Sequence, residues 1–440
     1  MSYRDVATRP VAAWGAVAVG ARMPVAMAPL ALVFLVRERP GGYVLGAMLA
    51  AAYVVGEIVG APLLGMRMRA ERARPQLAVG LAVGALGFGV LGALPQAHPV
   101  VLGGAAFLAG AAPAAVPGGL RALLTSLVPE HAAAQALSAE SVLTFSVWAV
   151  SPAAVTGLAL GVAPQLPLVL AAVLMASSVA GLWMLPVGWR SDENDRGGES
   201  MVRIMVRAWP VYVTGAASLS LLALAELVLP ALLEQRGIEV GWAGPLLAGL
   251  AIGSAVGSLV YGLRSWPGRL RTQSMVLMFA VSGVVAVVAL MPSTALIAAG
   301  LVVAGLLQAG AMLTRNLTLR EVLPPSALAA GYSVMYASVG AGYAASGSLA
   351  GGLLTVVAPS TAILAGVGLT LVLTVVGVLG EVKPSPSGEV KPSPSGEVKP
   401  SPSGEVEPSP SGEVKPSPSG DADVLERAPV RGGSDTESRL

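Results

Sequence analysis

The chain contains no cysteine, only two histidines and, before residue 381, no lysine. Without cysteine it forms no disulfide and has no thiol chemistry. The two histidines, His98 and His131, lie at expected loop edges, which disfavours a histidine-rich metal site. The sequence also has no nucleotide-binding Gly-Lys-Ser/Thr loop and no nucleophile–histidine arrangement. It therefore predicts neither an enzyme nor a resident cofactor or metal.

Charged side chains are scarce as well. They make up 12% of the 440 residues, whereas 54% are hydrophobic, and the mean hydropathy is +0.73. Apolar runs of about 18 or more residues indicate spans in a lipid bilayer. The net charge of +2 is too small to indicate a nucleic-acid partner. The polar N-terminus leads directly into a full-length apolar run, which predicts a first membrane span rather than a cleaved signal peptide.

One stretch of the chain occurs twice. Residues 56–76 read GEIVGAPLLGMRMRAERARPQ, and residues 253–273, 197 positions later, read GSAVGSLVYGLRSWPGRLRTQ. Eight of these 21 positions are identical, namely Gly56/Gly253, Val59/Val256, Gly60/Gly257, Gly65/Gly262, Arg67/Arg264, Arg72/Arg269, Arg74/Arg271 and Gln76/Gln273. Each copy is an apolar, glycine-stepped helix that ends at a short arginine loop. Because a repeat reflects a repeated architecture, we expect two similar halves.

Clusters of proline, glycine and charge divide the apolar part of the chain into twelve expected spans. The spans must be helical, because lipid offers backbone amides no partners. They lie near 10–35, 43–65, 76–95, 99–128, 132–161, 166–188, 208–233, 242–263, 274–292, 294–316, 327–355 and 358–380. We expect an N-terminal six-helix bundle over 1–189, a hydrophilic linker over 190–207 and a C-terminal six-helix bundle over 208–380.

The arginines are distributed unevenly between the loops. Most of them fall before the first span, after the second and eighth spans, and in the linker, whereas the opposite loops hold only Arg37, Arg39 and Arg236. The positive-inside rule then predicts that both termini are cytoplasmic. The bias towards Ala, Gly, Val and Arg is typical of a GC-rich bacterial gene, so we expect a bacterial plasma membrane.

Residues 381–440 differ completely in composition. The segment GEVKPSPS occurs four times from residue 380 onwards, and once as GEVEPSPS. Such closely spaced prolines prevent both helix and sheet, which predicts a disordered cytoplasmic tail. Two roles remain open, a docking or phosphorylation arm that uses the Ser-Pro sites and a tolerated low-complexity expansion. The second is favoured.

Six plus six spans, a central linker and a glycine-then-basic loop in each half resemble the major facilitator superfamily over about residues 10–380. The resemblance implies two pseudo-symmetric bundles with a substrate cavity between them at the midplane. It also implies a conformational-switch role for the repeated loops, that is, for Gly65, Arg67, Arg72, Arg74, Gly262, Arg264, Arg269 and Arg271. In this family the loop carries an aspartate that pairs across the interface between bundles. Here Leu64 and Tyr261 stand in its place, so that pairing is not expected.

Ionised side chains inside spans are costly and are therefore functional candidates. The candidate proton-coupling network consists of Arg22, Glu57, Arg121, Glu140 and Glu226. Arg121 and Glu140 flank Pro129 by eight and eleven residues, which places both roughly 10–15 Å from the membrane edge on antiparallel neighbours. Two interpretations remain open. Glu140 binds a proton, so that loss of the pair biases the conformation, or the two form a static ion pair.

The other charged residues in the spans also leave alternatives. Arg22 clamps an anionic substrate group or pairs within its own bundle with Glu57 or Glu140, and pairing is favoured. Glu226 suits a proton carrier or a site for a cationic substrate, or it reaches the external water. Glu57 faces the interface between bundles or caps a packing seam. Arg315 lies towards the cytoplasmic end of its span, and we expect it at the membrane interface.

The candidate cavity wall consists of polar, aromatic and adaptable apolar residues, namely Met23, Met27, Trp148, Gln308 and Tyr336. The leading hypothesis is a monomeric, proton-coupled exporter of small apolar or amphipathic compounds. Few fixed polar groups in the spans and a partial antiporter motif, Ser151-Pro152 with Gly157, favour it. One alternative is a proton-coupled importer or facilitator of a small polar nutrient. A second is a non-transporting membrane scaffold or sensor that acts through its tail.

Overall fold

The computed structural model describes residues 3–40, 42–185 and 198–382. The repeat tail predicted over 381–440 lies outside these residues apart from Glu381 and Val382, and so does the first part of the predicted linker. The described residues all belong to one compact unit, Met1–Pro384. They form helices and turns, without a strand in any of the described ranges.

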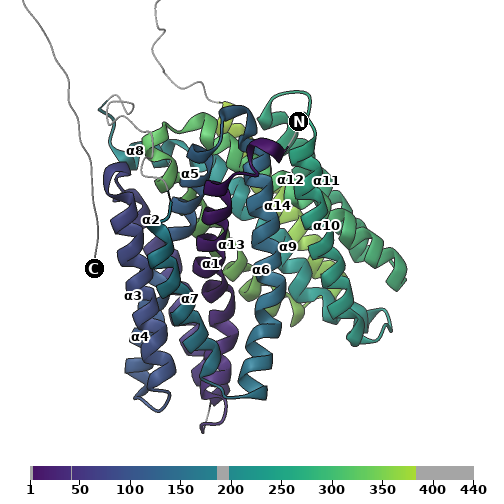
Figure 1. Ribbon diagram of the computed structural model, residues 1–440. Helices are drawn as coiled ribbons and strands as arrows, with labels where there is room; N and C mark the ends of the chain where they lie inside the picture. Colours follow the sequence, from purple (N-terminus) through teal and green to yellow (C-terminus); the bar gives the residue numbers. More distant parts are fainter. Residues whose placement is uncertain (1–2, 41, 186–197, 383–440) are drawn as a thin grey trace, which may run out of the picture. The chain divides into compact units, whose positions relative to one another are not determined.

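The described residues contain fourteen α-helices (Figure 1). In chain order they are α1 (Arg9–Val36), α2 (Gly42–Met66), α3 (Ala73–Ala93), α4 (Pro99–Ala111), α5 (Val116–Leu127), α6 (Ala133–Gly161), α7 (Leu166–Leu182), α8 (Met201–Arg207), α9 (Trp209–Gln235), α10 (Ala243–Leu263), α11 (Leu270–Leu290), α12 (Thr294–Val322), α13 (Leu328–Leu354) and α14 (Pro359–Val382). Short 3-10 turns lie at Tyr3–Asp5, Ala70–Arg72, Glu130–Ala132, Val240–Trp242 and Pro325–Ala327.

Each predicted span corresponds to a helical segment. Ten segments in the described part of the chain are long and apolar enough to cross a membrane, with α4 and α5 counted together as Pro99–Leu127. The other two predicted spans are α7, which is apolar but only 17 residues long, and α13, which has 27 residues and is rich in glycine, serine and tyrosine. The polar residues of α13 lower its hydropathy without shortening the helix.

The fourth span differs from the prediction of one continuous helix. Helix α4 ends at Ala111 and α5 begins at Val116, with Pro113 and Pro117 at the break. Proline has no backbone N–H to donate and its ring displaces the preceding turn, so a continuous helix is unfavourable here. The linker differs too, because its last residues form the short helix α8, which buries Ile204 and Met205.

The two copies of the sequence repeat pack against their neighbouring helices in the same way. Helix α2 packs against α4, and α10 packs against α12 in the same way. A Cβ atom on Gly60 would lie 2.3 Å from the carbonyl oxygen of Ala111, and one on Gly257 would lie 2.3 Å from that of Leu306. Both glycines therefore let a helix backbone approach more closely than any side chain permits.

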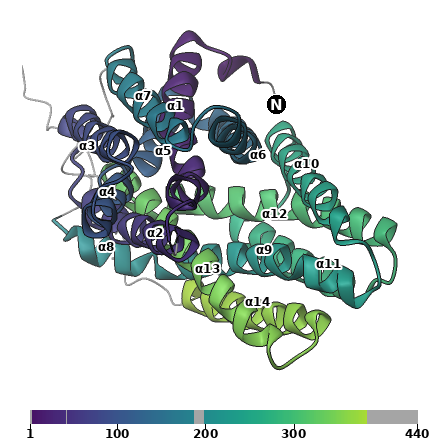
Figure 2. The ribbon, with the colours of Figure 1, turned by 90° about the horizontal axis from the view of Figure 1, so that it is seen from below.

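We call α1–α7 the amino-terminal half and α9–α14 the carboxy-terminal half; Figure 2 shows the purple-to-teal helices of the first gathered on one side and the green-to-yellow helices of the second on the other. Between them, α2 and α5 pack against α13, and α6 packs against α10. We call the end of the bundle that carries α8 and the two arginine loops the linker end.

The two halves meet at the linker end. Gly65 near the end of α2 and Gly118 in α5 both pack on Ser333 near the start of α13, and the Ser138 hydroxyl donates to the carbonyl oxygen of Ser258. Towards the other end α13 loses this cover. Between residues 338 and 354 only Ser346 and Ala350 are buried, and Ser346 is hydrogen-bonded within its own half.

Candidate functional site

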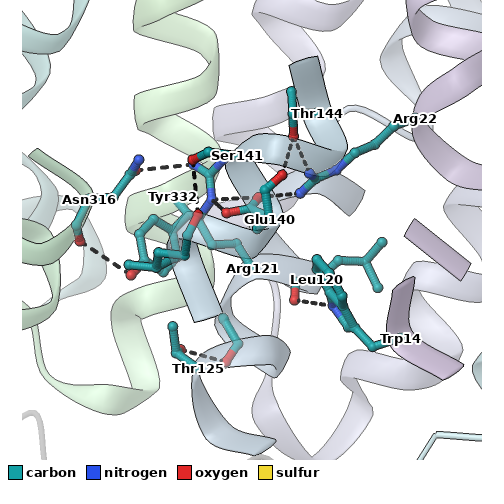
Figure 3. A network of polar contacts seen from close by, with 12 residues as sticks. Trp14, Arg22, Leu120, Arg121, Thr125, Glu140, Ser141, Thr144, Asn316 and Tyr332 are labelled. Carbon is teal, nitrogen blue, oxygen red and sulfur yellow. Dashed lines mark hydrogen bonds and ion pairs between the residues drawn. The ribbon is translucent and has the colours of Figure 1, made fainter. Parts of the chain in front are cut away.

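A cluster of charged side chains lies on the inner face of the amino-terminal half (Figure 3). Its centre is Glu140 on α6, which is 1% exposed. The Nε of Arg121, on α5, donates to both carboxylate oxygens, at 2.9 and 2.8 Å. The Nη2 of Arg22, on α1, donates to the same carboxylate. The pairs Arg121–Glu140 and Arg22–Glu140, predicted from the sequence, thus meet at one acid.

The residues that hold the charged side chains of this cluster in place lie one or two helical turns from them. Thr144 lies one turn after Glu140, and its hydroxyl accepts from Arg22 Nη1 at 2.6 Å while donating to the Glu140 carbonyl at 2.9 Å. Trp14 lies two turns before Arg22, with its ring centroid 5.8 Å from the guanidinium carbon. The Trp14 indole N–H donates to the carbonyl oxygen of Leu120 at 2.7 Å. Helices α1, α5 and α6 are therefore held together around both arginines.

Arg121 also reaches the other half. Its Nη1 donates to Oδ1 of Asn316, on α12, at 3.1 Å, and its guanidinium lies 5.5 Å from the ring centroid of Tyr332, on α13. The Tyr332 hydroxyl donates to the Asn316 carbonyl oxygen at 3.3 Å. Sequence reasoning missed both of these partners. The signal for one was present, because Asn316 precedes Pro324 by eight residues, as Arg121 precedes Pro129.

The cluster carries more positive than negative charge. Two guanidinium groups (+2) share one carboxylate (−1), which leaves +1. The Arg121 side chain is 19% exposed, and its Nη2 makes no hydrogen bond within the described residues. This nitrogen is the open donor of the cluster.

Glu57 lies at the interface between the halves, as one of the two interpretations predicted. Its Oε1 accepts from the hydroxyl of Tyr336, on α13, at 3.1 Å, and from that of Tyr53, one turn earlier on α2, at 3.4 Å. No arginine forms an ion pair with it in the part of the chain that the structure describes. Tyr336, predicted to line the cavity, thus contacts a carboxylate of the opposite half.

Glu226 stays apart from the cluster. It lies on α9 and is partly exposed, and no described residue forms a hydrogen bond or an ion pair with its carboxylate. Its predicted roles, as a proton carrier or a cation site, remain predictions.

The other predicted cavity residues have different surroundings. Met23 is half-buried beside Arg22, and Trp148 is 53% exposed. Met27 is fully buried in the amino-terminal core. Gln308 is buried too, and its amide exchanges hydrogen bonds with Ser218 of its own half at 3.0 and 3.2 Å. Met27 and Gln308 therefore line no open space in this structure, because packing and an internal hydrogen bond occupy them.

The repeated loops act mainly within their own halves. Arg74 Nη2 donates to the carbonyl oxygen of Leu185, and Arg271 Nη2, at the equivalent position, donates to that of Val378 at 2.9 Å. Arg271 thus binds a carbonyl near the C-terminal end of α14, and Arg74 binds one just after the end of α7. The remaining loop arginines, Arg67, Arg72, Arg264 and Arg269, are exposed.

Where the family's aspartate would stand, the two copies differ. Leu64 is exposed, whereas the Tyr261 hydroxyl donates to Gln273 Oε1 at 2.7 Å within its own loop. The contact between halves at this position is instead the close packing of Gly65 on Ser333. Gly262 is buried next to Tyr261.

A second group of charges closes the linker end of the carboxy-terminal half. Arg315 is 1% exposed rather than solvated at the interface, which corrects the expectation from its depth. Its Nη1 donates to Glu381 at 2.7 Å and to the Thr214 hydroxyl at 3.1 Å. Arg271 also contacts Glu381, at 3.4 Å. The position of Arg315 along α12 does not predict this acidic partner, because Glu381 lies on another helix, near the C-terminal end of α14.

No family model matches the chain, and no curated protein matches it in sequence. Solved structures do match. FucP, described as a major facilitator superfamily transporter in the outward conformation, gives a TM-score of 0.63 at 12% identity over 86% of this chain and 99% of its own. This chain has the major facilitator superfamily fold. The predicted arrangement of two six-helix halves in a multi-pass membrane protein is thereby confirmed.

Two further structures support this fold. A variant of the E. coli fucose:proton symporter FucP gives a TM-score of 0.65 at 11% identity, covering 84% of this chain and 98% of its own. The human organic anion transporter MFSD10 (TETRAN) gives 0.64 at 13% identity, covering 86% of this chain and 100% of its own. At these identities the likeness is one of fold.

Proposed function

We propose that this chain is a monomeric secondary transporter that moves a small molecule by alternating access and is driven by protons. The observation that carries the proposal is the position of Arg121, which contacts Glu140 in its own half and Asn316 in the other. Separation of the halves at the linker end must break the second contact. A change at Glu140 therefore changes how firmly this end is closed.

The linker end is cytoplasmic if the positive-inside rule holds, so the structure corresponds to an outward-facing state. The contacts of Gly65 and Gly118 with Ser333 support this assignment, and so does the uncovered outer part of α13. FucP is described in the outward conformation as well.

Proton drive is supported by three carboxylates inside spans, Glu57, Glu140 and Glu226, in a chain with few other charges there. A solved structure with this fold is that of a fucose:proton symporter. We propose that export of small amphipathic compounds is the direction of transport, as the scarcity of fixed polar groups along the spans favours. Import of a polar nutrient is a second candidate, which the buried polar cluster around Glu140 favours.

Transport into and out of proteoliposomes tests this proposal. A panel of lipophilic dyes, antibiotics and organic acids is offered with and without an imposed pH gradient, to wild type and to Glu140→Gln. We expect the gradient to accelerate flux of at least one compound in wild type, and Glu140→Gln to lose that acceleration. Wild-type flux that is equal with and without the gradient contradicts proton drive.

The scaffold alternative is tested by removing the tail. The cut belongs after Val382, because Glu381 pairs with buried Arg315 and its loss would disturb the bundle itself. A transporter keeps its flux without residues 383–440, whereas a scaffold that acts through the tail loses its role.

A further inference from the structure

The cluster around Glu140 has a net positive charge and a hydrogen-bond donor, Nη2 of Arg121, that no described residue uses. Arg22, Arg121 and Glu140 sum to +1, in a region where an uncompensated charge is unfavourable. Arg121 Nε and Nη1 are used by Glu140 and Asn316, but Nη2 is not used by any described residue. A guanidinium with one open edge is suited to the oxygen of an anionic group.

A further acid inside a span is Glu57, and it forms no ion pair with either arginine. Its partners are the hydroxyls of Tyr53 and Tyr336. If Glu57 is ionised, the two arginines and two glutamates sum to zero. If Glu57 is protonated, the sum is +1, and a bound anion restores neutrality. Protonation of Glu57 and binding of an anion at Arg121 therefore change the net charge of the region in opposite directions. The proton and the anion bind at different atoms.

The elements around Glu57 offer no other ionised partner. Helix α2 packs against α1, α4 and α13. Helix α4 contains no titratable residue, α13 contributes Tyr336, and α1 contributes Arg22, whose guanidinium is bound to Glu140. Arg121 on α5 is directed at Glu140 and Asn316. Glu57 is therefore an acid of this region whose ionised form is not held by an ion pair with any described arginine.

Tyr336 lies within electrostatic reach of both positions, because Glu57, Arg22 and Arg121 all act on its hydroxyl. Its hydroxyl donates to the Glu57 carboxylate across the interface between halves, and protonation of Glu57 weakens this charge-assisted bond. Met23, which follows Arg22 in the chain, is half-buried and packs against the apolar core of the amino-terminal half. The region offers a positive anchor in a half whose core is apolar.

We propose that the open edge of Arg121 binds the anionic group of a small amphipathic organic anion, such as a monocarboxylate, and that Glu57 takes up one proton when the anion binds. This assignment rests on the proposed transport function and names its substrate class. Because coupling between two ligands is reciprocal, the anion must bind more tightly as the pH falls. For one proton per anion the change in Kd approaches tenfold per pH unit where Glu57 titrates.

Binding to the purified full-length chain in lipid nanodiscs tests the proposal without any transport. The probes are acetate, benzoate and octanoate, each compared with its uncharged amide, by calorimetry at about pH 6 and about pH 8. These carboxylates are ionised throughout that range, so the probes themselves do not titrate. The variants are Glu57→Gln, Arg121→Lys and, as a matched control, Glu234→Gln, which removes an exposed acid near the end of α9.

We expect at least one carboxylate to bind tenfold or more tightly than its amide, and more tightly at the lower pH. Glu57→Gln should keep the binding but lose its pH dependence, because the amide mimics the protonated acid. Arg121→Lys should weaken binding of the carboxylate tenfold or more and leave binding of the amide unchanged, and Glu234→Gln should behave as wild type.

Two results overturn the proposal. If no carboxylate binds more tightly than its amide, Arg121 is not an anion site. If binding is independent of pH in wild type, or equally dependent in Glu57→Gln, Glu57 does not take up the proton. Neither result decides whether a pH gradient drives transport in proteoliposomes. Failure of this proposal can therefore be distinguished from failure of the proposed transport function.

Discussion

Glu140 is the residue on which the cluster depends. It accepts hydrogen bonds from two guanidinium groups while only 1% of it is exposed. A buried ion pair adds little net stability, but removal of one partner leaves a buried charge without compensation. In this cluster one carboxylate compensates two arginines on two different helices.

Replacement of Glu140 by glutamine should therefore destabilise the chain. We expect a loss of about 3–5 kcal/mol, as for other broken buried pairs, measured as a lowered unfolding temperature in detergent. Glu226→Gln is the control, because no described residue pairs with Glu226, and it should leave the unfolding temperature nearly unchanged. Equal shifts in both variants would contradict the assigned role of Glu140.

The sequence predicts part of this cluster and misses part. Arg121 and Glu140 were paired correctly because their distances from Pro129 fix their depth on neighbouring helices. Asn316 and Tyr332 were missed, since a contact between halves depends on how two bundles meet and leaves no periodic signal in either helix. Arg315 was misplaced because helix depth says nothing about its partner on α14.

At the scale of elements, the glycine repeats set the distance between helices. Gly60 on α2 and Gly257 on α10 each lie against a carbonyl oxygen of the neighbouring span. The same two-helix unit therefore occurs once in each half, and the spacing of its helices is fixed by residues without a side chain.

Alanine at these two positions should destabilise the halves similarly. The added methyl group would lie 2.3 Å from a backbone carbonyl in both, and overpacking typically costs about 1–3 kcal/mol. Gly89→Ala on α3 is the control, because nothing lies within 4 Å of its Cβ position and alanine favours helix. Unfolding temperatures in detergent measure all three variants, and unchanged values for Gly60→Ala and Gly257→Ala would refute the close packing.

The element boundaries follow from sequence only where composition changes sharply. The two halves were predicted from one repeat of 21 residues. The break between α4 and α5 was not, although Pro113 and Pro117 mark it, because a proline pair inside an apolar run also occurs in continuous, kinked helices. The sequence predicts part of the linker where α8 lies, since seven residues are too short to show a helical period.

At the scale of the molecule, the described residues of the two halves form a joint core at the linker end. The large buried cluster of the amino-terminal half also contains residues of the other half, among them Leu319 on α12 and Tyr332 on α13. The second large cluster, between Leu221 and Val367, contains residues of the carboxy-terminal half alone. Alternating access requires this joint core to open. The sequence predicts the two halves but not this state, because both states of a carrier share one sequence.

The most direct test is a reversible cross-link across the linker end. Ala61 on α2 and Ala337 on α13 belong to one buried cluster, and a chain without cysteine needs no background substitutions. In Ala61→Cys/Ala337→Cys, flux of a compound that wild type transports in proteoliposomes is measured after oxidation and again after reduction. The two single-cysteine variants are the controls. We expect oxidation to stop flux in the double variant alone and reduction to restore it. Full flux in the oxidised, cross-linked protein would contradict transport by opening of this end.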